Sequence, residues 1–229
     1  MTRSATPVNV RAALVQAALE IFAEKGFESA STREIADRAN TNISSIRYYF
    51  GDKAGLYRAA YTEPLSGADL TPPPDLFETH SLQQALEILY KAFLEPLKHG
   101  ETLRLVMKLH FREMIEPTGA WEQEIDAEIR PHHHMLVHAL SRRFGLEKPD
   151  LDVHRLAFSL VGIAVHYMIG QDLVDAFCPA VLKSRRAVDV LVQRLAGYGL
   201  GMVHAEYLRR GLPVPGDLLA SLSAQGGAQ

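Results

Sequence analysis

The stretch from Ser31 to Lys53, STREIADRANTNISSIRYYFGDK, brings hydroxyl groups, tyrosine rings and cations together in a short segment. Hydroxyl groups can hydrogen-bond base edges or phosphate oxygens, tyrosine rings can contact a thymine methyl group, and cations attract phosphates. The types and spacing of these residues therefore predict contact with DNA. The residues that we expect to contact it are Thr32, Arg33, Asn42, Ser44, Ser45, Arg47, Tyr48, Tyr49 and Lys53.

Two short helices would have to position these side chains. Ser31 and Glu34 fit the S-x-x-E capping box, which predicts a helix that begins at Thr32. Asn40 stands where this helix should end, and asparagine tolerates the left-handed conformation that is common there. The inward face of the helix consists of Ile35, Ala36 and Ala39.

A second short helix is predicted from Ile43 to Phe50, with Asn42 as its N-cap and Ile46 and Phe50 packing inward. Asp52 can cap the helix that follows. Helix, short turn and helix form the helix-turn-helix arrangement, whose second helix enters the major groove. From the residues alone, an ordinary pair of helices in a small bundle is the alternative.

Residues 10–60 resemble the DNA-binding domain of TetR-family transcriptional regulators. The matching segments are FAEKGF at 22–27, STREIADRA at 31–39 and SSIRYYFGDKAGLY at 44–57. Two features depart from the family pattern: residues 40–42 are Asn-Thr-Asn in place of Gly-Val-Ser, and Arg47 stands where tyrosine is frequent. The resemblance implies a dimeric DNA-binding regulator with an effector pocket in its C-terminal helices, and we expect a repressor that a small-molecule effector releases from a palindromic operator.

Composition places the chain among ordinary globular proteins. Its 229 residues can form one large or two small domains, and 47% apolar with 22% charged residues is typical of soluble proteins. A single cysteine, Cys178, excludes an internal disulfide framework. No segment has the pattern of a signal peptide or a transmembrane helix, so we expect a cytoplasmic protein without membrane contact.

Charge is unevenly distributed along the chain. The formal net charge of −3 divides into +2 for residues 1–60 and −5 for residues 61–229. The basic excess of the first segment is modest. Specific contacts and dimerisation are therefore expected to supply much of any affinity for DNA.

The chain is predicted to be all-α and to form two domains. Residues 1–63 would be the DNA-binding domain, with the helix-turn-helix at about 31–50, and residues 75–215 an effector-binding and dimerisation domain. The segment SGADLTPPPD at 66–75 would separate them. The tail SLSAQGGAQ is predicted to be disordered, and the predicted helices span 8–25, 53–63, 81–98, 101–116, 120–144 with a break or kink at Pro131, 152–170 and 184–211.

The last two long helices are candidates for a dimer interface. The helix at 152–170 carries two apolar stripes and needs two partners, and the helix at 184–211 carries a heptad-like seam. Both could be central to a monomer core, but we favour a homodimer in which each subunit contributes two helices to a four-helix bundle. The interface residues that we expect are Val153, Leu160, Tyr167, Val188, Leu191, Leu195, Tyr198 and Met202.

Aromatic and methionine side chains of the second domain are candidates for an effector pocket, since such side chains line adaptable apolar cavities. Such side chains at helical spacing are more often part of a core than of a pocket. The segment HFREMIEPTG at 110–119 is similar to the CecR-like branch of the family, which identifies no effector. The pocket residues that we expect are Phe93, Met107, Phe111, Met114, Trp121, His138 and His166.

No catalytic motif or metal site is predicted. Three adjacent histidines at 132–134 diverge around a helix, and only His134 and His138 could share an ion. A metal-assisted helical enzyme or ligand-binding protein without a role on DNA is the rival hypothesis, and activity lost on chelation would support it. A helix-bundle adaptor that binds only proteins is a third, and it predicts no salt-dependent binding to nucleic acid. We expect no enzyme activity and no cofactor.

Overall fold

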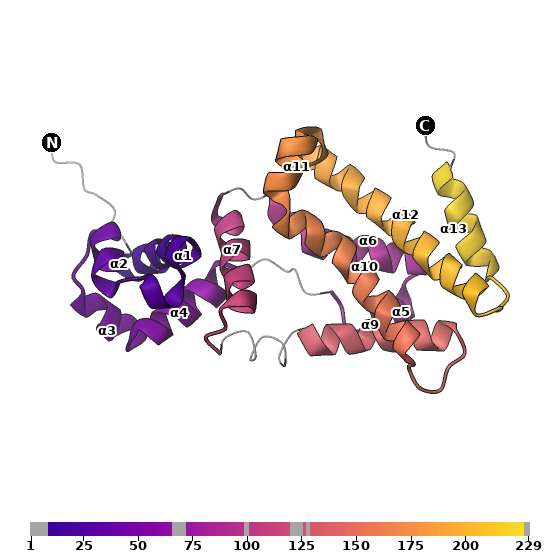
Figure 1. The fold of residues 1–229 in the computed structure, drawn as a ribbon, viewed down its shortest axis with the longest axis horizontal. Coiled ribbons are helices and arrows are strands. Elements are labelled where there is room, and N and C mark those ends of the chain that lie inside the picture. Colours follow the sequence, from indigo (N-terminus) through magenta and orange to yellow (C-terminus); the bar gives the residue numbers. More distant parts are fainter. Residues whose placement is uncertain (1–8, 66–71, 99–100, 120–125, 127–128, 227–229) are drawn as a thin grey trace. The chain divides into compact units, whose positions relative to one another are not determined.

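The computed structural model describes residues 9–65, 72–98, 101–119, 126 and 129–226, and every regular element in these ranges is a helix (Figure 1). This confirms the all-α class. The chain forms two compact units, one of residues 1–68 with 100–123 and one of residues 69–99 with 124–229. The predicted functional division at residues 63 and 75 stays a prediction, but the helix at 101–115 packs in the first unit although it follows that boundary.

The first unit is built from α1 (Val10–Ser29), α2 (Thr32–Arg38), α3 (Ser44–Phe50), α4 (Lys53–Thr62), the 3-10 turn η1 (Glu63–Leu65) and α7 (Glu101–Ile115). The apolar stripe predicted on α1 is buried throughout. Spacings of three and four residues place those side chains on one face, and this face packs against α4 and α7. The buried members of the stripe are Leu14, Ala17, Ala18, Ile21 and Phe22.

The predicted end of α1 at Gly26 is a kink inside a longer helix. Gly26 has a φ of +79°, and helical turns continue to Ser29. The guanidinium of Arg112 on α7 donates to the carbonyls of Ala23 and Glu24, in the turn before the kink, at 3.3 and 2.9 Å. The positive φ of Gly26 favours glycine, and a Cβ there would lie 2.8 Å from the Arg112 guanidinium, which would have to shift.

A buried carboxylate joins α7 to α4. Glu113 is fully buried, and its Oε2 accepts a hydrogen bond of 2.5 Å from the Tyr57 hydroxyl. Its Oε1 accepts from the backbone N–H of Thr118 at 2.7 Å. Burial and the neighbouring Glu113 carboxylate raise the pKa of Tyr57 far above its usual value of 10. Nothing in the sequence pattern indicates this pair, because its members lie 56 residues apart.

The second unit contains the other helices of the described residues. They are α5 (Leu76–Thr79), α6 (Leu82–Leu94), the 3-10 turn η2 (Glu95–Lys98), α9 (Arg130–Arg143), α10 (Leu151–Ile169), α11 (Gln171–Phe177), the 3-10 turn η4 (Pro179–Val181), α12 (Arg185–Arg209) and α13 (Gly216–Gly226). α6 packs along α12 and also contacts α10, and α10 packs on α9. Pro131 lies in the first turn of α9, where its missing N–H is tolerated, and residues 127–128 on the other side of the predicted break lie outside the described ranges.

Tyr90 of α6 lies at the centre of the second unit. Its ring is fully buried and its hydroxyl donates to the Leu160 carbonyl of α10 at 3.0 Å. Burial raises the pKa of Tyr90 well above the usual value. A Cβ at Gly199 of α12 would lie 2.9 Å from the Tyr90 Oη, so the glycine permits three helices to meet.

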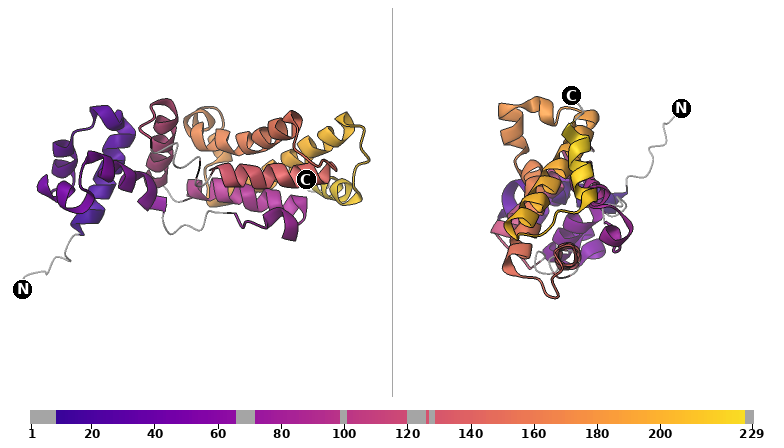
Figure 2. Two further views of the ribbon diagram at one scale, coloured as in Figure 1. Left: turned by 90° about the horizontal axis from the view of Figure 1, so that it is seen from below. Right: turned by 90° about the vertical axis from the view of Figure 1, so that its right-hand side faces the viewer.

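Two local predictions need correction. Ser31 occupies the N-cap position of α2, but its side chain makes no cap hydrogen bond. The Glu34 side chain, which would complete the capping box, pairs with Lys25 at 2.6 Å instead. The capping box forms at Ser81 and Gln84, at the start of α6. The tail predicted to be disordered is helical as far as Gly226, because Leu218 is buried and α13 folds back beside α12 (Figure 1 and Figure 2).

Among the described residues, no single helix is both long and apolar enough to cross a membrane. Taken together, α10 and α11 pass such a test by length and composition, and they are bent by 72°.

Candidate nucleic-acid interface and ligand pocket

The turn between α2 and α3 has the predicted geometry. Asn40 has a φ of +50° and is the only non-glycine residue with positive φ among those described. Its N–H donates to the Asp37 carbonyl at 3.0 Å and the Thr41 N–H to the Ala36 carbonyl at 2.9 Å, which closes the end of α2. The predicted role of Asn40 is therefore confirmed.

α3 begins at Ser44, one residue later than predicted, with Ile43 at its N-cap position, and Asn42 supports this first turn from the residue before. The Asn42 Oδ1 accepts from the backbone N–H of Ser44 at 2.9 Å and from the Ser44 hydroxyl at 2.8 Å. These bonds satisfy a donor that the helix leaves free at its first turn. The Thr41 and Ser45 hydroxyls share a hydrogen bond of 3.3 Å. Asn42, Ser44 and Ser45 are thus engaged within the turn, and their first role is to fix the direction of α3.

The outward face of α3 carries one cation and two aromatic rings. Ile46 is buried and anchors the helix, whereas Tyr48 is 82% exposed and Tyr49 41% exposed. The two rings meet edge to face with centroids 4.8 Å apart. Arg47 is exposed beside them. Phe50 is half-buried and packs beneath the Arg11 guanidinium, 5.2 Å from its ring centroid.

Arg33 of α2 is exposed, and Thr32 is half-buried. Neither Arg33 nor Arg47 forms an ion pair with any residue in the described part of the chain. A guanidinium that is not neutralised by its own chain remains available to a phosphate or a guanine edge.

Lys53 differs from these arginines. Its ammonium donates to the Glu28 carbonyl at 3.3 Å and lies 4.6 Å from the Phe27 ring centroid. It therefore ties the first turn of α4 to the end of α1, in addition to any contact with DNA. The Asp52 side chain caps α4 by accepting from the Gly55 N–H at 2.7 Å, as predicted.

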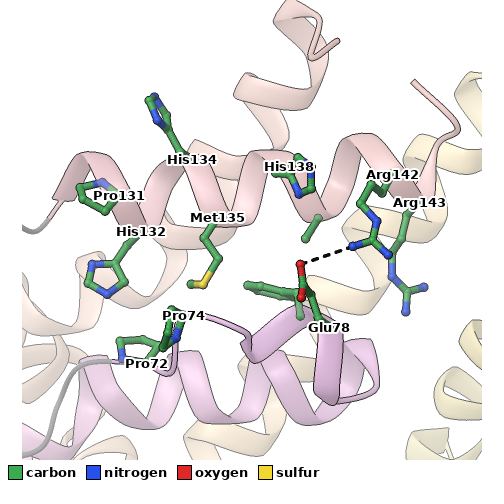
Figure 3. Close-up of a pocket in the computed structure, with 12 residues that line it drawn as sticks. Pro72, Pro74, Glu78, Pro131, His132, His134, Met135, His138, Arg142 and Arg143 are labelled. Atoms are coloured by element: carbon green, nitrogen blue, oxygen red, sulfur yellow. Dashed lines mark ion pairs between the residues drawn. The ribbon is translucent and has the colours of Figure 1, made fainter. Parts of the chain in front are cut away.

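A cavity of about 780 Å³ opens between α5 and α9 in the second unit (Figure 3). Its polar lining consists of Glu78, His132, His134, His138, Arg142 and Arg143. Its apolar lining consists of Pro72, Pro74, Phe77, Pro131, Met135 and Ala139. Arg142 pairs with Glu78 at 3.5 Å.

Of the seven predicted pocket residues, only His138 lines this cavity. Met107, Phe111 and Met114 belong to the first unit and Phe93 and His166 to the second, while Trp121 lies outside the described residues. Met107 is buried in its unit, whereas Met114 is 49% exposed. The polar lining along α9 follows a helical spacing, since His134, His138 and Arg142 recur at intervals of one helical turn. A prediction based on aromatic and methionine side chains does not include this basic pattern.

Comparison with known proteins identifies the class. The family model described as bacterial regulatory proteins, tetR family, matches residues 14–60, and the family model described as the C-terminal domain of the HTH-type transcriptional dual regulator CecR matches residues 82–201. The chain belongs to the TetR family of transcriptional regulators and carries its CecR-type C-terminal domain. The resemblance stated from the sequence is confirmed in both parts.

Three relatives show the extent of the likeness. The transcriptional dual regulator CecR of Shigella flexneri is 29% identical over 172 residues, which are 70% of this chain and 76% of that one. A TetR-family regulator from Bordetella parapertussis has a TM-score of 0.62 at 18% identity over 84% of this chain and 95% of its own. The regulator FadR of Bacillus subtilis, solved with stearoyl-CoA, has a TM-score of 0.56 at 19% identity over 81% and 96% of the two chains. These structural likenesses concern the fold.

The predicted dimer residues of this TetR-family chain are mostly inside its own core. Five of the eight have at most 7% of their surface exposed, because the predicted seam of α12 packs against α6 within the protomer. A side chain buried in this way cannot contact a second copy. Only Tyr198 is exposed, at 59%, and Tyr167 and Met202 are half-buried. The buried five are Val153, Leu160, Val188, Leu191 and Leu195.

A different apolar stripe is exposed on each of these helices. On α10, Leu151, Phe158 and Ile169 are 70%, 64% and 50% exposed. On α12, Val190, Tyr198 and Leu208 are 47%, 59% and 61% exposed. Large apolar side chains grouped on the surface of a protein mark an interaction site. In Figure 1 both helices lie on the near side of their unit, with α6 behind them.

His133 of α9 shares a hydrogen bond of 3.1 Å with His154 of α10 and stacks on the Phe158 ring. Burial, and then the neighbouring histidines, lower the pKa of His133. Within the described residues, no group of three or more His, Cys, Asp or Glu side chains could hold a metal ion.

Proposed function

We propose that this TetR-family regulator represses transcription by binding a palindromic operator as a homodimer, and that a small-molecule effector releases it. The observation that carries the DNA-binding role is the two-sided character of α3. Ile46 holds one side in the core, and the other side presents Arg47, Tyr48 and Tyr49 to solvent. That side would enter the major groove.

The proposed DNA contacts fall into two groups. Arg33, Arg47, Tyr48 and Tyr49 have exposed side chains that can reach bases and phosphates. Most of the others act mainly through the local structure that they build, and a phosphate contact by any of them would be additional. This second group contains Asn42, Ser44, Ser45 and Lys53. Thr32, which is half-buried at the start of α2, stays a proposed contact without a described local role.

The proposed homodimer uses the exposed stripes of α10 and α12. Gly162 on α10 and Gly201 on α12 have open space where the Cβ of another residue would stand, so neither is covered by a neighbouring helix of its own chain. Small residues allow helices of two subunits to approach closely. Two copies related by a twofold axis would then bury these stripes and hold two recognition helices for two half-sites.

The proposed effector is an organic molecule that binds in the C-terminal helices and shifts the protein towards a conformation with lower affinity for DNA. Because FadR of Bacillus subtilis was solved with stearoyl-CoA, acyl-CoA thioesters are the first compounds to test. His138 is the one predicted pocket residue that we retain for the described cavity. We further propose that the protein acts in the cytoplasm, without enzyme activity or a metal.

The DNA-contact proposal is tested by fluorescence anisotropy with a duplex selected from a random pool. Arg47→Ala and Tyr48→Ala should each weaken binding by about ten- to a hundredfold, since a specific base contact contributes about 1–3 kcal/mol. Lys148→Ala is the matched control, because it removes an exposed charge from the loop after α9. Circular dichroism should show all three variants folded. Wild-type affinity in both α3 variants would refute this docking.

A further inference from the structure

We propose that the groove between α5 and α9 binds an organic anion with an apolar body, such as a carboxylate or a phosphate ester. Its role as an effector site rests on the proposed function, but binding itself does not. The volume of about 780 Å³ lies within the range of small-molecule sites. The groove lies entirely within the second unit.

The two sides of the groove differ in chemistry. Along α9, His134, His138 and Arg142 follow one another at one-turn intervals, which forms a row of N–H donors (Figure 3). The neighbouring row on the same helix is apolar and contains Met135 and Ala139. An amphiphilic ligand could thus place its apolar part on one row and its charged group on the other.

The segment opposite α9 completes the apolar side. Pro72 and Pro74 lie below Met135 in Figure 3, and Phe77 of α5 also lines the groove. Proline rings are rigid and carry no N–H, so this wall offers contact area without a donor that a ligand would have to satisfy. These residues favour an apolar ligand body over a fully hydrated ion.

The charge balance of the groove favours an anion. Arg142 and Arg143 contribute two positive charges, and Glu78 is the one carboxylate in the lining. Glu78 meets Arg142 at 3.5 Å, with the two side chains 61% and 62% exposed. An ion pair this open is weak, so a ligand carboxylate or phosphate can displace Glu78 and take the Arg142 guanidinium in a bidentate arrangement.

The neighbouring Arg143 is held more firmly. Its guanidinium lies 3.5 Å from Asp217 of α13 and is only 27% exposed. Arg142 is therefore the cation whose existing ion pair a ligand can break with the smaller loss of free energy. The anion should bind at the Arg142 end of the groove, with His138 one turn away as a second donor.

The test is a fluorescence titration of the full chain with two matched probes. Anilinonaphthalene sulfonate is an aromatic anion, and phenylnaphthylamine is the same ring system without the sulfonate. The wild-type protein should bind the sulfonate more tightly than the neutral probe. Equal affinities for the two probes would overturn the proposal.

Three variants locate the site. Arg142→Gln should weaken sulfonate binding about three- to tenfold and leave the neutral probe unchanged, because a charge-assisted contact is lost. Glu78→Gln should tighten sulfonate binding by about two- to fivefold and leave the neutral probe unchanged, since the competing ion pair is removed; a partly unfolded variant would instead bind both probes more strongly. Arg130→Gln is the control, because Arg130 lies on the same helix in an exposed ion pair outside the groove. Sulfonate binding that is the same in all three variants would refute the assignment.

This result is separable from the proposed function. If the variants show no specific sulfonate binding in the groove but the protein binds a palindromic duplex, the groove proposal is refuted and the regulator role stands. If the groove binds the sulfonate specifically but the protein has no affinity for DNA, the groove proposal stands and the regulator role is refuted. If the groove site and the regulator role are both supported, acyl-CoA thioesters should displace the sulfonate from the wild-type protein more readily than from Arg142→Gln. Failure to displace the sulfonate would exclude acyl-CoA thioesters as ligands of this groove.

Discussion

Tyr57 and Glu113 show how single residues hold the DNA-binding unit together. The phenol donates to a carboxylate that is fully buried, and Thr118 supplies that carboxylate with further donors. A buried carboxylate that loses a donor is costly, whereas one with its donors in place is stable. The pair therefore links α7 firmly to α4 and limits the positions that α4 can adopt.

Tyr57→Phe should lower the free energy of unfolding by about 1–3 kcal/mol near pH 7, because Glu113 loses one buried donor. Since the folded-state pKa of Tyr57 is raised above 10, the contribution of its protonated hydroxyl is complete below pH 10 and is lost as the pH rises further. Urea unfolding at several pH values checks this. Wild-type stability should fall more steeply than variant stability above pH 10, and parallel slopes would contradict the assignment.

Local capping was predictable from the sequence where side chain and backbone lie within four residues. Asn40 takes the predicted left-handed conformation at the end of α2, and Asp52 caps α4 as predicted. Asn42 bonds the first turn of α3, although Ile43 occupies the N-cap position. In the predicted capping box at Ser31, the Glu34 side chain does not reach back because it has a competing partner, Lys25. That partner comes from another helix, and a pattern of local spacing contains no information about it.

At the scale of elements, the decisive feature is which face of α10 and α12 turns inward. Each helix carries apolar residues on more than one side, so periodicity alone does not determine which side faces the core of the protomer. The packing of α6 against α12 uses the seam that the sequence pattern favours for a dimer. Tyr90 and Gly199 fix this choice, because the hydroxyl reaches α10 only where α12 lacks a side chain.

This meeting of three helices predicts a non-additive pair of variants. Gly199→Ala should destabilise the protein by about 1–3 kcal/mol, since the new methyl group would lie 2.9 Å from the Tyr90 Oη. In the double variant Tyr90→Phe with Gly199→Ala, part of that cost should be recovered, because the nearest clash is removed. Chemical denaturation of the four proteins measures the coupling. Purely additive effects would mean that the helices do not meet as described.

At the scale of the whole molecule, the all-α class and the family followed from the sequence, whereas the packing of α7 in the first unit did not. The helix-turn-helix has strong local signals, and the C-terminal part consists of amphipathic helices that must pack on one another. The pocket was not predictable, because its lining combines a proline-rich connection with one face of α9. Histidine and arginine along α9 have the pattern of a solvated surface, and only the approach of α5 makes them part of a groove.

The proposed dimer predicts an effect of Tyr198→Glu. Tyr198 is 59% exposed in the protomer, so the substitution should leave the protomer folded. In a dimer it would bury a charge at the interface, which should shift the protein to monomers and weaken operator binding. Sedimentation velocity at several concentrations measures the shift. Val190→Glu should act in the same direction, and unchanged dimers in both variants would place the interface elsewhere.

The central claim is that two recognition helices read two half-sites of DNA. Selection of bound duplexes from a random pool, with the wild-type protein, tests it most directly. We predict an inverted repeat whose half-sites are centred about one helical turn apart, or a multiple of it, with binding that weakens steeply as salt rises. Recovery of a single unrepeated site, or of no common sequence in the presence or absence of acyl-CoA thioesters, would contradict the account.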